Sequence, residues 1–173
     1  MCSCLKDFVM PKQLTDLTPN TWGPIYWKLL HILSSHVGEA GDMLDGDVAN
    51  GFFFVINHLH TVLPCADCTT HARKYIAENR FDPRGLAGMP LRTYIEAWLL
   101  TFHNAVRIRK EQAIEIETVS AYHVRWRSET FQPCDNESMN LFFDYGKTYH
   151  VIDVAQFARW VVQMKRLRLL LGV

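Results

Sequence analysis

The spacing of apolar residues constrains the fold of this chain more than any other feature of the sequence. Glycine and proline interrupt the sequence at 38–46, 64, 83–90 and 133, and between these breaks apolar side chains recur at helical rather than alternating spacing. The pattern is strongest near the middle of the chain, where one helical face would hold Leu91, Ile95, Trp98, Leu99, Phe102 and Val106. The sequence therefore predicts an all-α protein.

Four of the predicted helices are long enough to form a bundle. The predicted ranges are 22–38, 48–63, 65–79 and 90–110. The first opens after Thr21 and contains Pro24 in its first turn, where proline is tolerated. Pro64 ends the second, because proline is disfavoured in the interior of a helix. Helices of this length joined by short loops are typical of a four-helix bundle.

Two further helical segments follow the predicted bundle. The range 118–129 places Tyr122 and Trp126 one turn apart, so both aromatic side chains can cover the same surface like a lid. The range 154–171 is amphipathic and has a basic face opposite its apolar residues. This pattern favours a C-terminal helical extension that docks on a protein core or forms a dimer, rather than a membrane anchor.

Length and charge narrow the classes of protein that the chain can represent. Its 173 residues, 49% of them apolar, suffice for one compact core. We expect a flexible arm at 1–20, a helical domain at 21–129 and an extension at 130–173. Lysine plus arginine and aspartate plus glutamate number 18 each, which predicts no nucleic-acid partner. The sequence has neither a long apolar run nor an apolar secretory signal, so we expect a soluble protein without a membrane span.

The five cysteines suggest redox chemistry rather than a static disulfide scaffold. They form two close pairs, Cys2 with Cys4 and Cys65 with Cys68, and leave Cys134 alone, an odd total that argues against an extracellular scaffold. Cys65 and Cys68 lie one turn apart at a predicted helix start. Free backbone N–H groups and the helix dipole favour a thiolate there, so this pair suits a reversible disulfide.

A CxxC motif has other uses, and one of them remains open on the motif alone. A thioredoxin-like protein places it after a β-strand, whereas the residues before Cys65 have helical periodicity. A zinc site could use Cys65, Cys68 and His71 as three ligands. The candidates for a fourth ligand are His31, His58, His60 and His103. The sequence lacks a second CxxC or an HxxxH motif that would complete such a site.

Three motifs surround the cysteine pair in a specific order. Trp22-Gly23-Pro24 precedes it with Trp27 and His31, His71 follows Cys68 by three residues, and Trp98 then precedes Phe102-His103-Asn104-Ala105-Val106. Over roughly Trp22 to Arg109, this order resembles the Erv/ALR family of FAD-linked sulfhydryl oxidases. The chain is most similar to the short forms encoded by large DNA viruses.

The resemblance implies a helical bundle around FAD, with the isoalloxazine ring beside the CxxC motif, and a homodimer. The cofactor-binding residues that it implies are Trp22, Gly23, Trp27, His31, Cys68, His71, Trp98, His103, Asn104, Val106, Arg107, Arg109 and Trp126. The chain departs from the family pattern at two positions. Arg107 replaces the second asparagine of the FHNxVN motif, and Gln112 replaces a lysine, so Arg109 is expected to supply a phosphate contact.

The activity implied by the resemblance is disulfide formation in protein thiols. Cys65 would exchange with the substrate, Cys68 would lie against the flavin, and oxygen would accept the electrons to give hydrogen peroxide. Cys2 and Cys4 are expected to act as a shuttle. The implied location is the host cytoplasm and the virion for a viral protein, or the mitochondrial intermembrane space for a cellular one. The alternatives are a zinc-stabilised helical interaction module without catalysis and a dimeric scaffold that has lost FAD.

Overall fold

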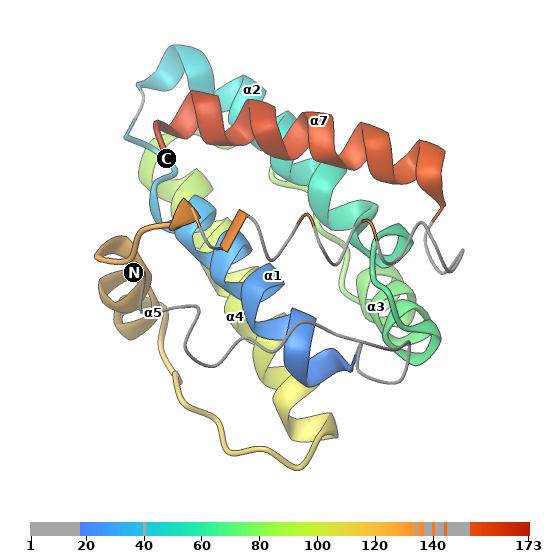
Figure 1. Cartoon of the computed structure of the whole chain (residues 1–173). Coiled ribbons are helices and arrows are strands. Elements are labelled where there is room, and N and C mark those ends of the chain that lie inside the picture. The colour runs from blue at the N-terminus through green and yellow to red at the C-terminus, as the bar shows by residue number, and fades with distance from the viewer. Residues whose placement is uncertain (1–17, 40, 134, 137–139, 141–143, 145–152) are drawn as a thin grey trace.

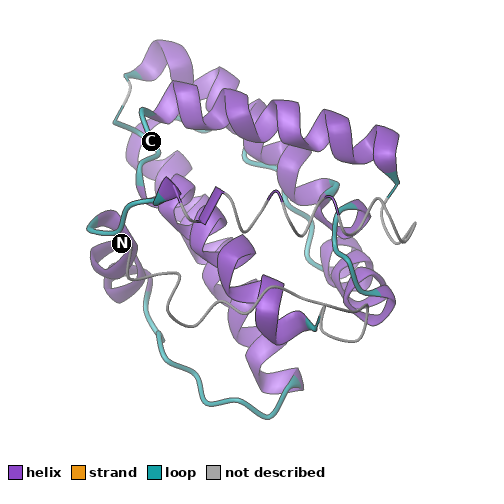
Figure 2. Ribbon diagram, in the orientation of Figure 1, coloured by secondary structure: helices purple, strands orange, loops and turns teal. Residues whose placement is uncertain are grey.

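The computed structural model describes residues 18–39, 41–133, 135, 136, 140, 144 and 153–173, and over these residues it contains helices and no strand. The helices are α1 (Pro19–Ser35), α2 (Asp42–Asn57), the short 3-10 helix η3 (Leu59–Thr61), α3 (Ala66–Glu78), α4 (Gly88–Arg109), α5 (Val119–Arg127) and α7 (Val154–Leu171). Figures 1 and 2 show this all-helical arrangement. The all-α prediction, with a bundle, a short fifth helix and a C-terminal helix, is confirmed.

The helices enclose one apolar core. Helix α1 packs on α4, α5 contacts both of them, and α2 packs on α4 and α7. Figure 1 shows α2 and α7 side by side in the upper part of the view, with α1 and most of α4 below them. The largest fully buried side chains come from five different helices and from the α3–α4 loop, namely Trp160, Tyr122, Phe52, Phe81, Leu30, Ile32, Leu33, Ile56, Leu91, Ile95 and Leu99. Helix α3 contributes the smaller buried side chain of Ala72 to this core, and its Tyr75 and Ile76 pack against it.

Helix α1 begins earlier than the sequence predicts. Thr18 is the N-cap, Pro19 is the first helical residue, and the Thr21 hydroxyl donates to the Thr18 carbonyl at 2.7 Å. Proline is favoured at this first position because its missing N–H has no helical partner there. Pro24 therefore lies inside the helix rather than in its first turn. The helix also ends before Gly38, at Ser35.

Helix α2 ends earlier than the apolar stripe predicts. The stripe continues to Leu63, but the helix stops at Asn57. At this end the His58 backbone N–H still donates to the Phe54 carbonyl at 3.1 Å, and the Asn57 side-chain amide donates to the Phe53 and Phe81 carbonyls at 2.8 and 3.1 Å. The stripe still points inward across the 3-10 turn, and Leu63 is buried. The prediction of a buried apolar face was right, and the prediction of one continuous helix was wrong.

Helix α7 docks on the core of the same chain. It buries Phe157, Trp160, Met164, Leu167 and Leu171, and the Trp160 indole N–H donates to the Val55 carbonyl of α2 at 3.0 Å. Among the described residues, no helix is both long and apolar enough to cross a bilayer.

Candidate functional site

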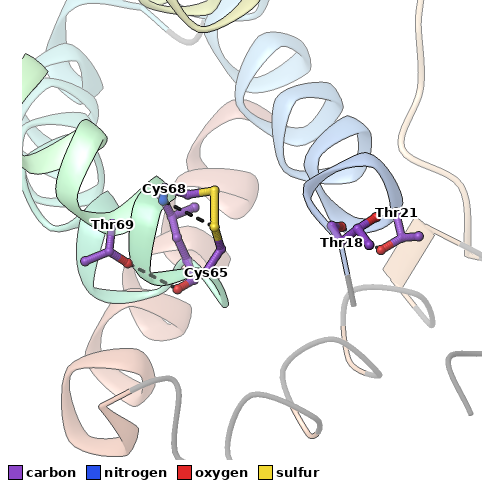
Figure 3. Close-up of a disulfide and its surroundings, with 6 residues drawn as sticks. Thr18, Thr21, Cys65, Cys68 and Thr69 are labelled. Carbon is purple, nitrogen blue, oxygen red and sulfur yellow. Dashed lines mark hydrogen bonds between the residues drawn. A yellow bond between two sulfur atoms is a disulfide. The ribbon is translucent and has the colours of Figure 1, made fainter. Parts of the chain in front are cut away.

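Cys65 and Cys68 form a disulfide at the N-terminus of α3 (Figure 3). Cys65 is the N-cap residue, and its sulfur accepts a hydrogen bond from the backbone N–H of Cys68 at 3.2 Å. The two Cα atoms are 5.2 Å apart, within the usual range for a disulfide. Reduction would leave the Cys65 thiolate facing the free N–H groups of the first turn, which stabilise negative charge. The structure thus places the pair where a dithiol and a disulfide can interconvert.

Two side-chain hydrogen bonds fix the segment that leads into the disulfide. The buried Tyr26 hydroxyl of α1 donates to the Val62 carbonyl at 3.0 Å, and the Thr69 hydroxyl of α3 donates to the Leu63 carbonyl at 3.3 Å. These bonds satisfy carbonyls that follow the 3-10 turn and have no helical partner. They hold the start of α3 against α1.

A cavity of about 460 Å³ lies between α1, α3 and α4, beside the disulfide. Cys68 lines this cavity and Cys65 does not. Its volume is within the range of small-molecule and cofactor sites, roughly 300–1,000 Å³. The disulfide therefore has two sides, with Cys68 toward the cavity and Cys65 outside its wall.

Stacked aromatic rings form one wall of the cavity. The indole of Trp27 stacks on the imidazole of His103, with centroids 4.3 Å apart and planes 10° apart. His31 lies behind this pair, 5.4 Å from Trp27 and 4.8 Å from Trp126. Flat rings of this kind present both a stacking face and polar edges to a planar ligand.

Two buried indole N–H groups at the cavity lack partners. Among the described residues, nothing bonds Nε1 of Trp22 or Nε1 of Trp126, and both side chains line the cavity. An unpaired buried donor costs about 1–3 kcal/mol, so such groups in native proteins usually have a ligand or water partner. This pair of donors fits a ligand that carries several acceptor atoms.

The end of α4 supplies positive charge to the cavity. Arg107, Arg109 and Lys110 all line it, at a helix C-terminus where cations are favoured. Arg107 is already held by the loop that follows, donating to the Ala113 carbonyl at 2.6 Å and pairing with Glu115 at 2.7 Å. Cations and aromatic rings in one cavity suit a ligand with phosphates and planar ring systems.

The histidines of the site are biased toward their neutral forms. Burial, with help from the nearby Arg107, lowers the pKa of His103 to about 4. Burial and the neighbouring His103 hold the pKa of His31 well below its usual range. Burial and the cationic Arg109 also lower the pKa of His71. These rings therefore act near neutral pH as stacking surfaces and uncharged hydrogen-bonding groups.

Most of the predicted cofactor-binding residues line the cavity. They are Trp22, Gly23, Trp27, Cys68, His71, His103, Val106, Arg107, Arg109 and Trp126. Three others lie elsewhere. His31 is fully buried behind His103, the Trp98 indole donates to the Asn79 carbonyl at 3.0 Å, and the Asn104 amide donates to the Ile116 carbonyl at 2.9 Å. A direct contact of these three with a cofactor stays a prediction.

Several residues of the cavity were missed by sequence reasoning. Tyr26 lines it one turn after Trp22, so helical spacing could have placed it on the same face. Lys110 lines it directly after Arg109, outside the motif. The predicted shuttle cysteines, Cys2 and Cys4, and also Cys134, lie outside the described residues.

The zinc alternative finds no support in the described part of the chain. No three histidine, cysteine, aspartate or glutamate side chains there are grouped closely enough to hold a metal ion. The nitrogens of His31 instead bond Tyr122 and His103, at 2.5 and 2.8 Å.

Comparisons with known proteins agree with this geometry. The profile of the Erv1/Alr family matches residues 24–127, more than half of the chain. Protein 347L of Invertebrate iridescent virus 6, provisionally named a FAD-linked sulfhydryl oxidase, is 29% identical over 66% of this chain and 99% of its own length. The FAD-linked sulfhydryl oxidase of a warthog isolate of African swine fever virus is 27% identical over 73% of this chain and 90% of its own length. No solved structure matches the chain at a significant level.

Proposed function

The chain belongs to the Erv1/Alr family and is a FAD-linked thiol oxidase, and from this membership we propose that Cys65 and Cys68 form disulfides in protein substrates and that oxygen receives the electrons. The carrying observation is the position of Cys68, whose side chain lines a cavity that also holds unpaired indole donors and cations. A thiol pair with one member at a cofactor cavity and the other outside it is what this reaction requires.

The cavity fits FAD by the chemistry of its lining. Trp27 and His103 offer stacking faces, the indole N–H groups of Trp22 and Trp126 need acceptors, and the basic end of α4 suits a pyrophosphate. FAD, when bound, accepts two electrons from a dithiol and passes them to oxygen, giving hydrogen peroxide.

Electron transfer from the substrate proceeds by two thiol–disulfide exchanges. A substrate thiolate attacks the Cys65 sulfur, breaks the Cys65–Cys68 bond and leaves Cys68 as a thiolate. A second substrate thiolate then attacks the substrate sulfur of the mixed disulfide and releases Cys65. The substrate gains a disulfide and loses two electrons and two protons, and the Cys65–Cys68 pair is left reduced. Cys65 suits the first attack because it lies outside the cavity wall.

A visible absorption spectrum and an oxygen electrode test this proposal. We expect purified protein to show flavin absorption and to consume oxygen when dithiothreitol is added. Cys65→Ser and Cys68→Ser should each retain FAD and lose at least about a hundredfold in turnover, because neither can form the disulfide. Cys134→Ser is the control and should keep its turnover. Oxidase activity in Cys68→Ser, or a colourless protein with stoichiometric zinc, would refute the assignment.

The setting of the reaction is also a proposal. We propose that the protein oxidises protein thiols in the host cytoplasm and the virion if it is viral, as the relatives named above are, and in the mitochondrial intermembrane space if it is cellular. We further propose a homodimer, and a shuttle role for Cys2 and Cys4. If they shuttle, their joint replacement by serine should slow oxidation of a reduced protein more than oxidation of dithiothreitol. Sedimentation analysis of the holoprotein tests the dimer.

A further inference from the structure

A chain of four hydrogen bonds runs from the backbone of α1 to the cavity wall. The Ser34 hydroxyl donates to the His31 carbonyl at 2.9 Å and lies 2.8 Å from the Tyr122 hydroxyl. That hydroxyl lies 2.5 Å from Nδ1 of His31, and Nε2 of His31 lies 2.8 Å from Nδ1 of His103. We call these four side chains, Ser34, Tyr122, His31 and His103, the relay. Ser34 and His31 are fully buried and Tyr122 is 1% exposed, so only the His103 end of the relay is open.

Each of the four side chains in this relay has one proton to donate. A serine or tyrosine hydroxyl carries one, and a neutral imidazole carries one on one of its two nitrogens. Both imidazoles are neutral near pH 7, because burial lowers the pKa of His31 well below its usual range and that of His103 to about 4. Four donors thus serve four contacts.

The carbonyl at the end of the relay fixes its direction. A carbonyl can only accept, so the Ser34 proton is used on His31. The Tyr122 hydroxyl must then donate to the Ser34 oxygen, and Nδ1–H of His31 must donate to the Tyr122 oxygen. Nε2 of His31 is left without a proton, so Nδ1–H of His103 donates to it. Any other assignment leaves a buried contact without a proton, at a cost comparable with a lost hydrogen bond.

We propose that Ser34 and Tyr122 are positioning residues that hold His103 in the tautomer protonated on Nδ1, so that Nε2 is a hydrogen-bond acceptor for the cofactor. The inference rests on the proposed function, because His103 lines the cavity assigned to FAD. An acceptor here selects a donor of the ligand, a sugar hydroxyl or an amine, and disfavours a phosphate oxygen. The phosphates are thereby directed to the basic end of α4.

The test uses two variants that break the relay at different points. In Ser34→Ala, the Tyr122 hydroxyl loses its acceptor and donates to Nδ1 of His31 instead. His31 then carries its proton on Nε2 and donates it to Nδ1 of His103. In Tyr122→Phe, Nδ1 of His31 loses its acceptor, and His31 and His103 reverse in the same way. Both variants should convert His103 to the tautomer protonated on Nε2. Ser34 lies three hydrogen bonds away from His103, so no direct contact can explain such a change.

Ser35→Ala is the matched control. Ser35 is the next residue of α1, is equally buried, and its hydroxyl donates to the Ile32 carbonyl at 2.8 Å, outside the relay. It loses the same group at the same burial and should leave the His103 tautomer unchanged. Should Tyr122→Phe fail to fold, the comparison of Ser34→Ala with Ser35→Ala still decides the question.

The readouts are the ring nitrogen resonances of His103 in histidine-labelled holoprotein and the affinity for FAD. The proposal expects a protonated Nδ1 in the wild type and a protonated Nε2 in Ser34→Ala, with FAD bound about tenfold or more weakly because a donor then replaces the acceptor. A protonated Nε2 in the wild type, or equal tautomers and affinities in Ser34→Ala and Ser35→Ala, would overturn it. The resonances can be recorded even if the protein oxidises no thiol, so the two proposals fail separately.

Discussion

The buried histidines make the stability of the protein depend on pH. In the folded protein the pKa of His103 is lowered to about 4 by burial, from an ordinary value of 6.5. The unfolded chain therefore binds more protons between these two values. The free energy of unfolding falls as the pH falls through this window, and its full value is present only above about pH 6.5.

We expect this loss to be on the order of 2 kcal/mol for His103 at acidic pH. Urea unfolding at a series of pH values measures it. His103→Asn removes the titrating group, and its unfolding free energy should change less between about pH 7 and pH 5 than that of the wild type. Parallel pH profiles of the two proteins would contradict the expectation. The slope is the readout, since the substitution can also change stability at every pH.

A second prediction for a single residue concerns the indole N–H of Trp126 and the affinity for FAD. Because this donor is buried at the cavity without a protein partner among the described residues, a bound ligand should satisfy it. Trp126→Phe keeps an aromatic ring and removes the donor. The loss of about 0.5–1.5 kcal/mol for one hydrogen bond predicts FAD binding weaker by about two- to tenfold.

Titration of FAD into apoprotein, followed by flavin fluorescence, checks this prediction. Trp98→Phe is the matched control, because the Trp98 indole already donates to the Asn79 carbonyl and does not line the cavity. It should change the affinity less than Trp126→Phe does. Equal losses in the two variants would show that Trp98 reaches the cofactor, as the family resemblance implies.

The motif residues were predictable one by one, whereas the groups that orient them were not. Trp22, Trp27 and His103 were found because the family pattern names them. Ser34 and Tyr122 have no such signal, since their role depends on the packing of α5 against α1. To assign the donor and acceptor of each hydrogen bond between these side chains, one must know which of them are in contact. Residue spacing in the sequence does not give contacts between helices.

At the scale of helices, the α2–α7 contact depends on a residue without a side chain. A Cβ added at Gly51 of α2 would lie 2.7 Å from Cδ2 and 2.9 Å from Cγ of Leu167 on α7. Leu167 is fully buried, so it has little room to move. Glycine, despite its poor helix propensity, is therefore needed here for close packing.

Gly51→Ala should lower the free energy of unfolding by about 1–2 kcal/mol, because the strain of overpacking exceeds the gain in helix propensity. Gly46→Ala in the same helix is the control, since a Cβ there meets nothing within 4 Å. It should raise the free energy of unfolding by about 0.5–1 kcal/mol. Thermal and urea unfolding of both variants give the signs, and a stabilised Gly51→Ala would disprove the close contact.

The spacing of apolar residues was enough to predict that these segments are helical. It did not predict the residues at which the helices begin and end. The stripe that ends at Leu63 could not reveal the break after Asn57. At that break the Asn57 amide donates to the Phe81 carbonyl, a contact between segments that are distant in the sequence. Similarly, the start of α1 depends on Pro19 and Thr18, which precede the first apolar residue of the stripe.

At the scale of the whole molecule, the residues matched by the family profile do not include all the residues of the hydrophobic core. The Erv1/Alr profile ends at residue 127, whereas the core also includes side chains of α7. The sequence predicted an amphipathic C-terminal helix but left open whether its apolar face meets this core or another molecule. Only the structure shows α2 as its partner, because an amphipathic pattern specifies a buried face and not what covers it.

Helix α7 should accordingly be essential for folding. Each of its five buried side chains contributes about 1.5–3 kcal/mol on burial, and their sum is comparable with the total stability of a typical domain, about 5–15 kcal/mol. A chain that ends at residue 152 also leaves the Val55 carbonyl without the Trp160 indole. We expect this shortened chain to lose cooperative thermal unfolding, measured by circular dichroism, and to lose bound FAD.

The control for this truncation keeps α7 and changes only its outer face. Val162 and Leu169 are 61% and 84% exposed, so replacing both by serine should leave the melting temperature within a few degrees. If the shortened chain instead melts as the full chain does, the core is complete without α7. The boundary predicted at residue 129 would then be correct, and α7 would be an appendage available to a partner. We expect the shortened chain to lose cooperative unfolding and the Val162 and Leu169 double variant to keep it. That result would show that the buried face of α7 stabilises the fold, and that α7 and the preceding helices form one folding unit.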